Sequence, residues 1–269
     1  LRPIISAKLP VEDPVLWNGR KNPYLYTVRC EIFDSTTQEV TDNIDIRTGL
    51  REYHIDSHKG FFLNGEHIKL QGVSRHQDRE NMGNAITEKQ HAEDVKIILD
   101  VGANSVRLAH YQQNSYFYDL CDESGLLVWA EVPVISRFSP KRNENAEQQL
   151  VELIKQNYNH PSIFCWGIEN EITIAGSASK KLITFLKHMH KVARHLDPTR
   201  YTTCAQLTMC PVNSPLNHIT DIIGYNHYYG WYMGSCDEIN NWLDEWHREN
   251  PEGKLCLSEY GAEGITKYH

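Results

Sequence analysis

Apolar and polar residues alternate strictly from Tyr26 to Ile32, in the first part of the chain. A period of two is typical of a β-strand with one buried face. The alternation returns at Ile44 and Ile46, and no helical periodicity interrupts this part. Further on, Asn64-Gly65 separates two apolar runs, which is the strongest short signal for a β-hairpin. The sequence therefore predicts β structure up to about residue 55 and a hairpin after it.

Seven short apolar runs follow, and amphipathic helical patterns separate most of them. The runs cover residues 70–74, 105–109, 126–132, 163–168, 201–205, 222–225 and 255–257. A capping box at Thr87 and Gln90 predicts the start of the first helix, and Pro161 and Pro198 follow the ends of two others. Repeated β-then-α order predicts a parallel sheet with helices outside. Seven or eight units over about 200 residues favour a (β/α)8 TIM barrel, an α/β fold, over a doubly wound sheet.

Composition narrows the classes of function. Hydrophobic residues make up 40% of the 269 residues and charged residues 23%, as in an ordinary globular protein. The net charge of −8 argues against a nucleic-acid surface, and no apolar run approaches the roughly 20 residues that cross a bilayer. The seven cysteines include no CxxC pair, which indicates reduced thiols. We therefore predict neither nucleic-acid nor membrane partners. No signal peptide is visible, so localisation stays open, with the cytoplasm preferred.

Two of the apolar runs end in a glutamate. Glu171 follows Asn170 after the fourth run, and Glu259 follows Ser258 after the seventh. Functional residues of such barrels lie at the carboxyl ends of the strands, so these carboxylates should face one another across the mouth. Either glutamate alone could equally belong to a structural ion pair. Two facing carboxylates suit glycoside hydrolysis, which is retaining at a separation of about 5–5.5 Å and inverting at about 6.5–9.5 Å.

Eight short stretches match one family in the same order over nearly the whole chain. They are Pro23-Tyr24-Leu25-Tyr26, Phe62-Leu63-Asn64-Gly65, Gly72-Val73-Ser74-Arg75-His76, Val106-Arg107-Leu108-Ala109-His110-Tyr111, Asn159-His160-Pro161-Ser162-Ile163, Asn170-Glu171, residues 225–232 and Ser258-Glu259-Tyr260-Gly261. With these the chain resembles glycoside hydrolase family 2, which includes bacterial β-galactosidases and β-glucuronidases. The resemblance implies carbohydrate metabolism by a retaining mechanism.

The resemblance implies a role for particular residues. Glu171 would be the acid/base and Glu259 the nucleophile of a double displacement. Asn170 would bind the sugar 2-hydroxyl, and Tyr228 would touch the nucleophile. The other predicted substrate-binding residues line the sugar pocket, and they are His76, His110, Trp166 and Asn226.

Two charged neighbours of these residues have other expected roles. Arg107 stands inside an apolar strand, so we expect it to support a carboxylate rather than touch the sugar. Glu169 occupies a position where relatives commonly have a small residue. Strand alternation would put it on the same face as Glu171. Whether Glu169 pairs with a basic neighbour or perturbs Glu171 stays open.

Two departures from the family pattern affect the expectations. Ile135 and Arg137 stand where the best-studied β-galactosidases have magnesium ligands, so we predict no catalytic magnesium, no other metal and no cofactor. The chain ends at His269, before an eighth barrel unit and before the Asn-x-Lys motif of β-glucuronidases. We therefore expect residues 1–55 to be the C-terminal part of an immunoglobulin-like β-sandwich. Residues 56–269 would be a TIM-barrel catalytic domain lacking its eighth unit.

The activity predicted from the sequence is retaining hydrolysis of terminal β-D-galactosides. Arg75-His76-Gln77-Asp78 resembles the β-galactosidase form of its motif more than the β-glucuronidase form. A β-glucuronidase of the same family is the alternative. A non-catalytic sugar-binding fragment is an alternative of another class. Whether the full-length parent is a homo-oligomer stays open.

Overall fold

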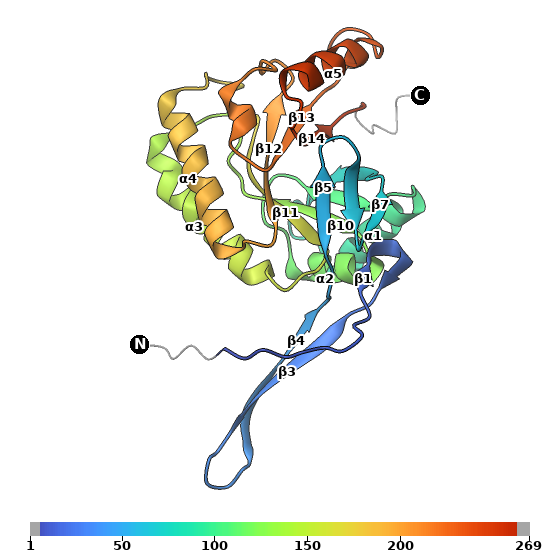
Figure 1. The fold of residues 1–269 in the computed structure, drawn as a ribbon, viewed down its shortest axis with the longest axis vertical. Helices are drawn as coiled ribbons and strands as arrows, with labels where there is room; N and C mark the ends of the chain where they lie inside the picture. The colour runs from blue at the N-terminus through green and yellow to red at the C-terminus, as the bar shows by residue number, and fades with distance from the viewer. Residues whose placement is uncertain (1–5, 263–269) are drawn as a thin grey trace.

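A curved parallel sheet of seven strands forms the main body of the chain in this computed structural model, which describes residues 6–262 (Figure 1). The strands are β8 (Gly72–Arg75), β9 (Ser105–Leu108), β10 (Leu127–Glu131), β11 (Ile163–Asn170), β12 (Tyr201–Leu207), β13 (Ile222–Asn226) and β14 (Leu255–Glu259). They lie in chain order, and every neighbouring pair is parallel. The predicted α/β fold is confirmed as a nearly closed TIM barrel. The outer ends of both predicted domains, residues 1–5 and 263–269, lie outside the described part.

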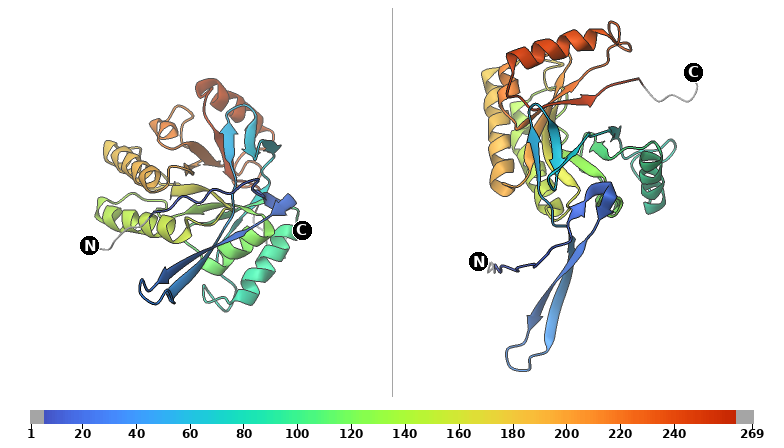
Figure 2. Two further views of the ribbon diagram at one scale, coloured as in Figure 1. Left: turned by 60° about the horizontal axis from the view of Figure 1, so that its bottom comes forward. Right: turned by 45° about the vertical axis from the view of Figure 1, so that its right-hand side comes forward.

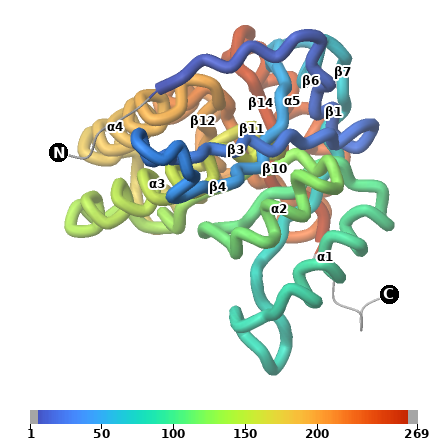
Figure 3. The backbone as a smooth tube through the Cα atoms, turned by 90° about the horizontal axis from the view of Figure 1, so that it is seen from below, coloured from blue at the N-terminus to red at the C-terminus, as the bar shows by residue number. Residues whose placement is uncertain are grey.

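Five α-helices of the described part cover the outside of the sheet (Figures 2 and 3). They are α1 (Glu88–Asp100), α2 (Ser115–Ser124), α3 (Asn143–Asn157), α4 (Lys180–Leu196) and α5 (Glu238–Glu249). Each agrees with a helix that the sequence predicts, and the capping box at the start of α1 forms as expected. Short 3-10 helices, η2 (Pro140–Arg142) and η3 (Pro215–His218), lie in the loops after β10 and β12. None of the described helices is long and apolar enough to cross a membrane.

Apolar side chains fill the space between the sheet and the helices. Leu150 and Leu153 of α3 and Met189 of α4 are fully buried there. Every residue of β11 is buried, because helices cover one face of this central strand and the barrel interior covers the other. The carboxyl end of β11 is thereby held in a rigid position, which matters for the residues that follow it.

A small antiparallel sheet packs against the amino-terminal end of the barrel. It consists of β5 (Tyr53–Asp56), β6 (Gly60–Leu63) and β7 (Glu66–Ile68). Phe61 joins Trp129 and Phe164 of the barrel strands in one buried cluster. The predicted hairpin turn is confirmed, since Asn64 and Gly65 have φ angles of +50° and +80°. The opposite, carboxyl end of the barrel is therefore the end available for a site.

The remaining strands lie outside the barrel. β1 (Trp17–Asn18) pairs with β2 (Asn22–Pro23), joined by the 3-10 helix η1 (Gly19–Lys21). β3 (Tyr26–Phe33) and β4 (Val40–Thr48) form a long hairpin that extends away from the barrel in Figures 1 and 2. The hairpin contains the strands predicted from alternation, and their place in the C-terminal part of an immunoglobulin-like sandwich stays a prediction. The proposed domain boundary after residue 55 falls inside β5.

Candidate active site

The two glutamates that the sequence singles out lie at the carboxyl ends of β11 and β14. Glu171 directly follows β11 and has a φ angle of +49°. Asn226, at the end of β13, donates its amide to Oε1 of Glu171 over 3.1 Å. Ser258 in turn donates to Oδ1 of Asn226 over 2.7 Å, which fixes the amide orientation. Three strands thus converge on the Glu171 carboxyl group.

Glu259 accepts hydrogen bonds on both carboxylate oxygens. Arg107, from β9, donates to Oε1 over 2.6 Å, and the Tyr228 hydroxyl donates to Oε2. Burial raises the pKa of Tyr228, and its hydrogen bond to Glu259 raises this pKa further. The phenol therefore remains a donor at neutral pH. A carboxylate that accepts from a guanidinium and a phenol is held as an oriented anion, the form that can attack an electrophilic carbon.

Arg107 connects this carboxylate with two further strands. Its guanidinium makes two bonds to Glu131, at 3.0 and 3.1 Å, and one to Oδ1 of Asn170 at 2.7 Å. Burial alone would raise the pKa of Glu131, but Arg107 and His110 outweigh it and hold the pKa below its usual range. The expectation that Arg107 supports a carboxylate agrees with these contacts. The sequence did not lead us to predict Glu131 as a site residue, although it too is a carboxylate at the end of an apolar run.

Arg107→Met is expected to lower the free energy of unfolding by about 3–5 kcal/mol, because it leaves the buried carboxylate of Glu131 and the partly buried carboxylate of Glu259 without their cation. Chemical denaturation of the full-length protein measures the change. The exposed pair between Arg29 and Asp45 provides the control, since solvent screens this pair and Arg29→Met should have a much smaller effect. Adding Glu131→Gln to Arg107→Met should restore part of the stability. Equal effects of Arg107→Met and Arg29→Met would contradict this description.

A cavity of about 740 Å³ opens beside Glu259, within the size range of small-molecule sites. His76, His110 and Tyr228 line it together with Arg107. The rings of His76 and His110 meet edge to face at 5.3 Å. Burial lowers the pKa of His76, and His110 lowers it further, so His76 is a neutral group near pH 7. These side chains could contact a sugar through hydrogen bonds and ring faces.

Asn170 and Asn226 lie at this site, but they present different groups. Oδ1 of Asn170 accepts from both Arg107 and Asn226, the latter at 3.2 Å. These bonds leave the Asn170 amide nitrogen to donate to a ligand hydroxyl. Asn226 uses its own amide and carbonyl on Asn170, Glu171 and Ser258. Its contacts therefore suit orientation of the acid/base better than substrate binding.

The structure places Trp166 elsewhere, which corrects its assignment to the sugar pocket. Its ring is fully buried in the core between sheet and helices, and Nε1 donates to Asp197 over 3.0 Å. The error has a simple cause, because an all-apolar strand gives no alternation from which to assign the faces.

Glu169 lies fully buried two residues before Glu171, and it contacts different groups. Its Oε2 accepts from the backbone N–H of Ile172 over 3.0 Å, and its Oε1 lies 3.4 Å from Nε2 of Gln206. The expectation that Glu169 and Glu171 lie on the same face of the strand is wrong. The strand register shifts between Gly167 and Asn170, and Glu171 adopts a left-handed backbone conformation. Burial raises the pKa of Glu169 to about 8, and no basic side chain is within hydrogen-bonding distance among the described residues.

This buried carboxyl group should make stability depend on pH. Between the usual glutamate pKa of 4.5 and the folded-state value of about 8, the folded protein binds more protons than the unfolded protein. Stability therefore falls as pH rises, with a slope that approaches about 1.4 kcal/mol per pH unit. We expect Glu169→Gln to remove this slope, as measured by denaturation at pH 5.5, 7 and 8.5. Glu245→Gln on the exposed face of α5 is the control, and identical slopes in wild type and Glu169→Gln would refute the assignment.

One group of side chains in the described part has the composition of a metal site. Asp119, Asp122 and His160 bring their ligand atoms within 4.8 Å of one another. Asp122 already accepts from His160 over 2.6 Å and from the backbone N–H of Ser162 over 3.1 Å. The group lies before β11, at the end of the barrel opposite Glu171. We assign it a structural role, and the prediction of no catalytic metal or cofactor stays a prediction.

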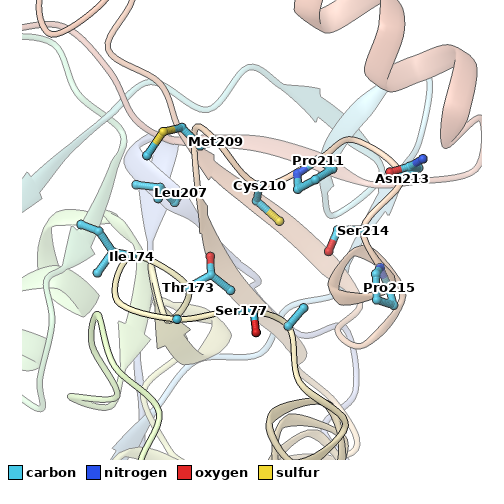
Figure 4. Close-up of a pocket in the computed structure, with 12 residues that line it drawn as sticks. Thr173, Ile174, Ser177, Leu207, Met209, Cys210, Pro211, Asn213, Ser214 and Pro215 are labelled. Carbon is cyan, nitrogen blue, oxygen red and sulfur yellow. The ribbon is translucent and has the colours of Figure 1, made fainter.

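A second cavity, of about 410 Å³, lies between the loops that follow β11 and β12 (Figure 4). Thr173 and Ile174 form one wall, and Leu207, Met209 and Cys210 form another. The side chains of Ile174 and Met209 are 50% and 71% exposed. The turn that begins at Glu171 is therefore only loosely packed on this side.

Comparison with known proteins identifies relatives across both parts of the chain. Residues 55–268 match a family model described as "Glycosyl hydrolases family 2, TIM barrel domain", and residues 2–51 match one described as "Glycosyl hydrolases family 2". A β-glucuronidase of Bacteroides fragilis is 41% identical over 98% of this chain and 38% of its own length. Other matching proteins are named β-galactosidase, for example in Thermoanaerobacter pseudethanolicus.

Solved structures give the same result. An FMN-binding β-glucuronidase from Faecalibacterium prausnitzii L2-6 is 46% identical, with a TM-score of 0.91, over 96% of this chain and 40% of that chain. Bacteroides uniformis β-glucuronidase 2, covalently bound to cyclophellitol-6-carboxylate aziridine, is 34% identical with a TM-score of 0.87. That match covers 96% of this chain and 32% of that one. The chain thus spans about two fifths or less of the length of these relatives.

Proposed function

This chain belongs to glycosyl hydrolase family 2, and from that premise we propose that its protein is a retaining β-glycoside hydrolase that acts on β-glucuronides. The observation that carries the proposal is the pair of differently held glutamates at the ends of β11 and β14. Glu259 is held as an anion by Arg107 and Tyr228, while the carboxyl group of Glu171 accepts from the neutral amide of Asn226. One group suits attack and the other suits proton transfer.

The proposed reaction has two displacements. Glu259 attacks the anomeric carbon as Glu171 gives its proton to the glycosidic oxygen, so the aglycone leaves as an alcohol and a glycosyl ester forms. Glu171 then takes a proton from water, which attacks the same carbon and releases Glu259. Two inversions give net retention. The covalent complex of the related B. uniformis enzyme supports such an intermediate.

The preference for a glucuronide replaces the galactoside expected from the sequence. That expectation depended on the motif that begins with Arg75. In the structure Arg75 forms an ion pair with a helix instead of facing the sugar pocket. Its guanidinium binds Asp94 of α1 at 2.7 Å, is only 6% exposed and also contacts His91. Arg75 therefore anchors α1 to β8, and its presence does not indicate which sugar the site binds. The relatives of highest identity given above are β-glucuronidases, which favours the glucuronide.

Assays of the full-length protein on p-nitrophenyl β-D-glucuronide and β-D-galactoside distinguish the alternatives. We expect kcat/KM to be at least about 100-fold higher for the glucuronide, because a site that pairs the sugar carboxylate rejects a sugar without it. The opposite ratio would support a β-galactosidase. Sugar binding without hydrolysis of either substrate would support a non-catalytic protein.

A further inference from the structure

Glu171 occupies a backbone conformation that needs support. A φ angle of +49° lies in the left-handed region, which is sterically unfavourable for a non-glycine residue. This conformation persists only where surrounding contacts favour it. It also determines the direction in which the carboxyl group leaves the end of β11.

Two hydrogen bonds flank the α-carbon of Glu171. On one side, its own N–H donates to the backbone carbonyl of Ala205 in β12 over 2.7 Å. On the other side, the N–H of Ile172 donates to the buried Glu169 carboxyl group over 3.0 Å. Each peptide plane also has a backbone bond, since the Ser136 N–H donates to the Asn170 carbonyl over 3.0 Å and the Ile174 N–H donates to the Glu171 carbonyl over 2.9 Å. The bond to Glu169 differs from these because it depends on a side chain that can be replaced.

The turn that begins at Glu171 is loosely packed on its outer side. Thr173 and Ile174 face the 410 Å³ cavity of Figure 4 instead of a filled core. The carboxyl group of Glu169 is fully buried and keeps a single position, because Gln206 approaches its other oxygen at 3.4 Å.

The groups around Glu169 favour the protonated, uncharged form of its carboxyl group. Oε1 of Gln206 is buried and has no hydrogen-bond partner in the described part of the chain. Rotation of this amide by 180° would turn Oε1 toward the proton of Glu169. The carboxyl group would then accept from Ile172 and donate to Gln206. Burial, which raises the pKa of Glu169 to about 8, favours the same neutral state.

We propose that Glu169 is a positioning residue for the acid/base, because its hydrogen bond to the Ile172 N–H adds to the backbone bonds that hold the left-handed conformation from which Glu171 reaches the leaving-group oxygen. The inference rests on the proposed function. Its consequence is specific to proton donation, since a displaced Glu171 matters most for substrates whose leaving group needs a proton.

The test compares two variants of the full-length protein on two substrates. Glu169→Met keeps the bulk of the side chain without a strong acceptor, whereas Glu169→Gln keeps the acceptor and the neutral charge. The substrates are phenyl and 2,4-dinitrophenyl β-glucuronide, or the galactosides if the enzyme prefers them. We expect Glu169→Met to lower kcat/KM about 10- to 100-fold for the phenyl glycoside and less than about threefold for the dinitrophenyl glycoside. Glu169→Gln should stay within about threefold of wild type on both.

A double-mutant cycle separates positioning from a merely structural role. In a Glu171→Ala background, Glu169→Met should change kcat/KM for the phenyl glycoside by less than about twofold, because there is no acid left to position. Ser179→Ala removes a cap at the other end of the same loop and should not discriminate between the substrates. If Glu169→Met does not fold, Gln206→Leu should give the same substrate-dependent loss.

Equal losses on both substrates, or full additivity with Glu171→Ala, would overturn the inference. So would a Glu169→Gln enzyme as impaired as Glu169→Met. These outcomes require an active wild type and leave the proposed function intact. A wild-type protein that hydrolyses neither glycoside would overturn the proposed function and this inference with it.

Discussion

Glu259→Gln is expected to lower kcat/KM on p-nitrophenyl β-D-glucuronide by about 10⁴-fold or more, a loss of about 5.5 kcal/mol in transition-state stabilisation. The amide has the size of the carboxylate but cannot form the glycosyl ester. Arg107 can still donate to the carbonyl oxygen of the amide, and the Tyr228 hydroxyl can accept from its NH2 group, so the fold should persist. Initial rates of the purified variant, together with its circular dichroism spectrum, measure both effects.

The matched control for this prediction is an exposed glutamate outside the site. Glu123→Gln on α2 removes only a surface pair with Arg47 and should leave kcat/KM within about twofold of wild type. A second result sharpens the test. Azide added to Glu259→Ala should restore turnover and give the α-glycosyl azide, because azide replaces the missing nucleophile. Activity of Glu259→Gln within tenfold of wild type would refute the nucleophile assignment.

Glu171→Ala is expected to lower kcat/KM for phenyl β-glucuronide by about 10²- to 10⁴-fold, the usual contribution of a general acid. The loss should be much smaller for the dinitrophenyl glycoside, whose leaving group departs without a proton. Azide should raise kcat of this variant on the dinitrophenyl substrate, since an anion attacks the ester without a general base. The expected product is the β-glycosyl azide.

Asn226 offers a graded comparison for this prediction. Its amide is the polar side-chain partner of Glu171 in the described structure, so Asn226→Ser should reduce kcat/KM for the phenyl substrate less than Glu171→Ala does. A uniform loss on both substrates, or an α-glycosyl azide product from Glu171→Ala, would show that Glu171 is not the acid/base. Steady-state rates and product analysis by NMR measure these outcomes.

Periodicity in the sequence was sufficient to predict the fold of the barrel. The runs that became β8 to β14 are short and apolar, in keeping with the burial of both faces of the inner strands β9 to β13, and amphipathic helices of the right length separate most of them. The same logic located Glu171 and Glu259, since a carboxylate at the end of such a run is costly unless it has a function or a partner.

Other features depended on contacts that no local pattern encodes. Trp166 and Glu169 lie in a strand without alternation, and the register shift between Gly167 and Asn170 moves side chains from their expected faces. Arg75 belongs to the motif from which a galactoside was predicted, yet it binds Asp94 of α1. The role of Glu131 became visible only when β9 brought Arg107 beside it.

The central claim is that Glu259 forms a covalent ester with the sugar, and mass spectrometry tests it most directly. The full-length protein would be incubated with 2-deoxy-2-fluoro-β-D-glucuronyl fluoride, or with the galactosyl analogue if that is the better substrate class, and then digested with protease. We predict one modified peptide, with the fluorosugar attached to Glu259. Attachment to Glu131, Glu169 or Glu171, or an unmodified but inhibited enzyme, would contradict the account.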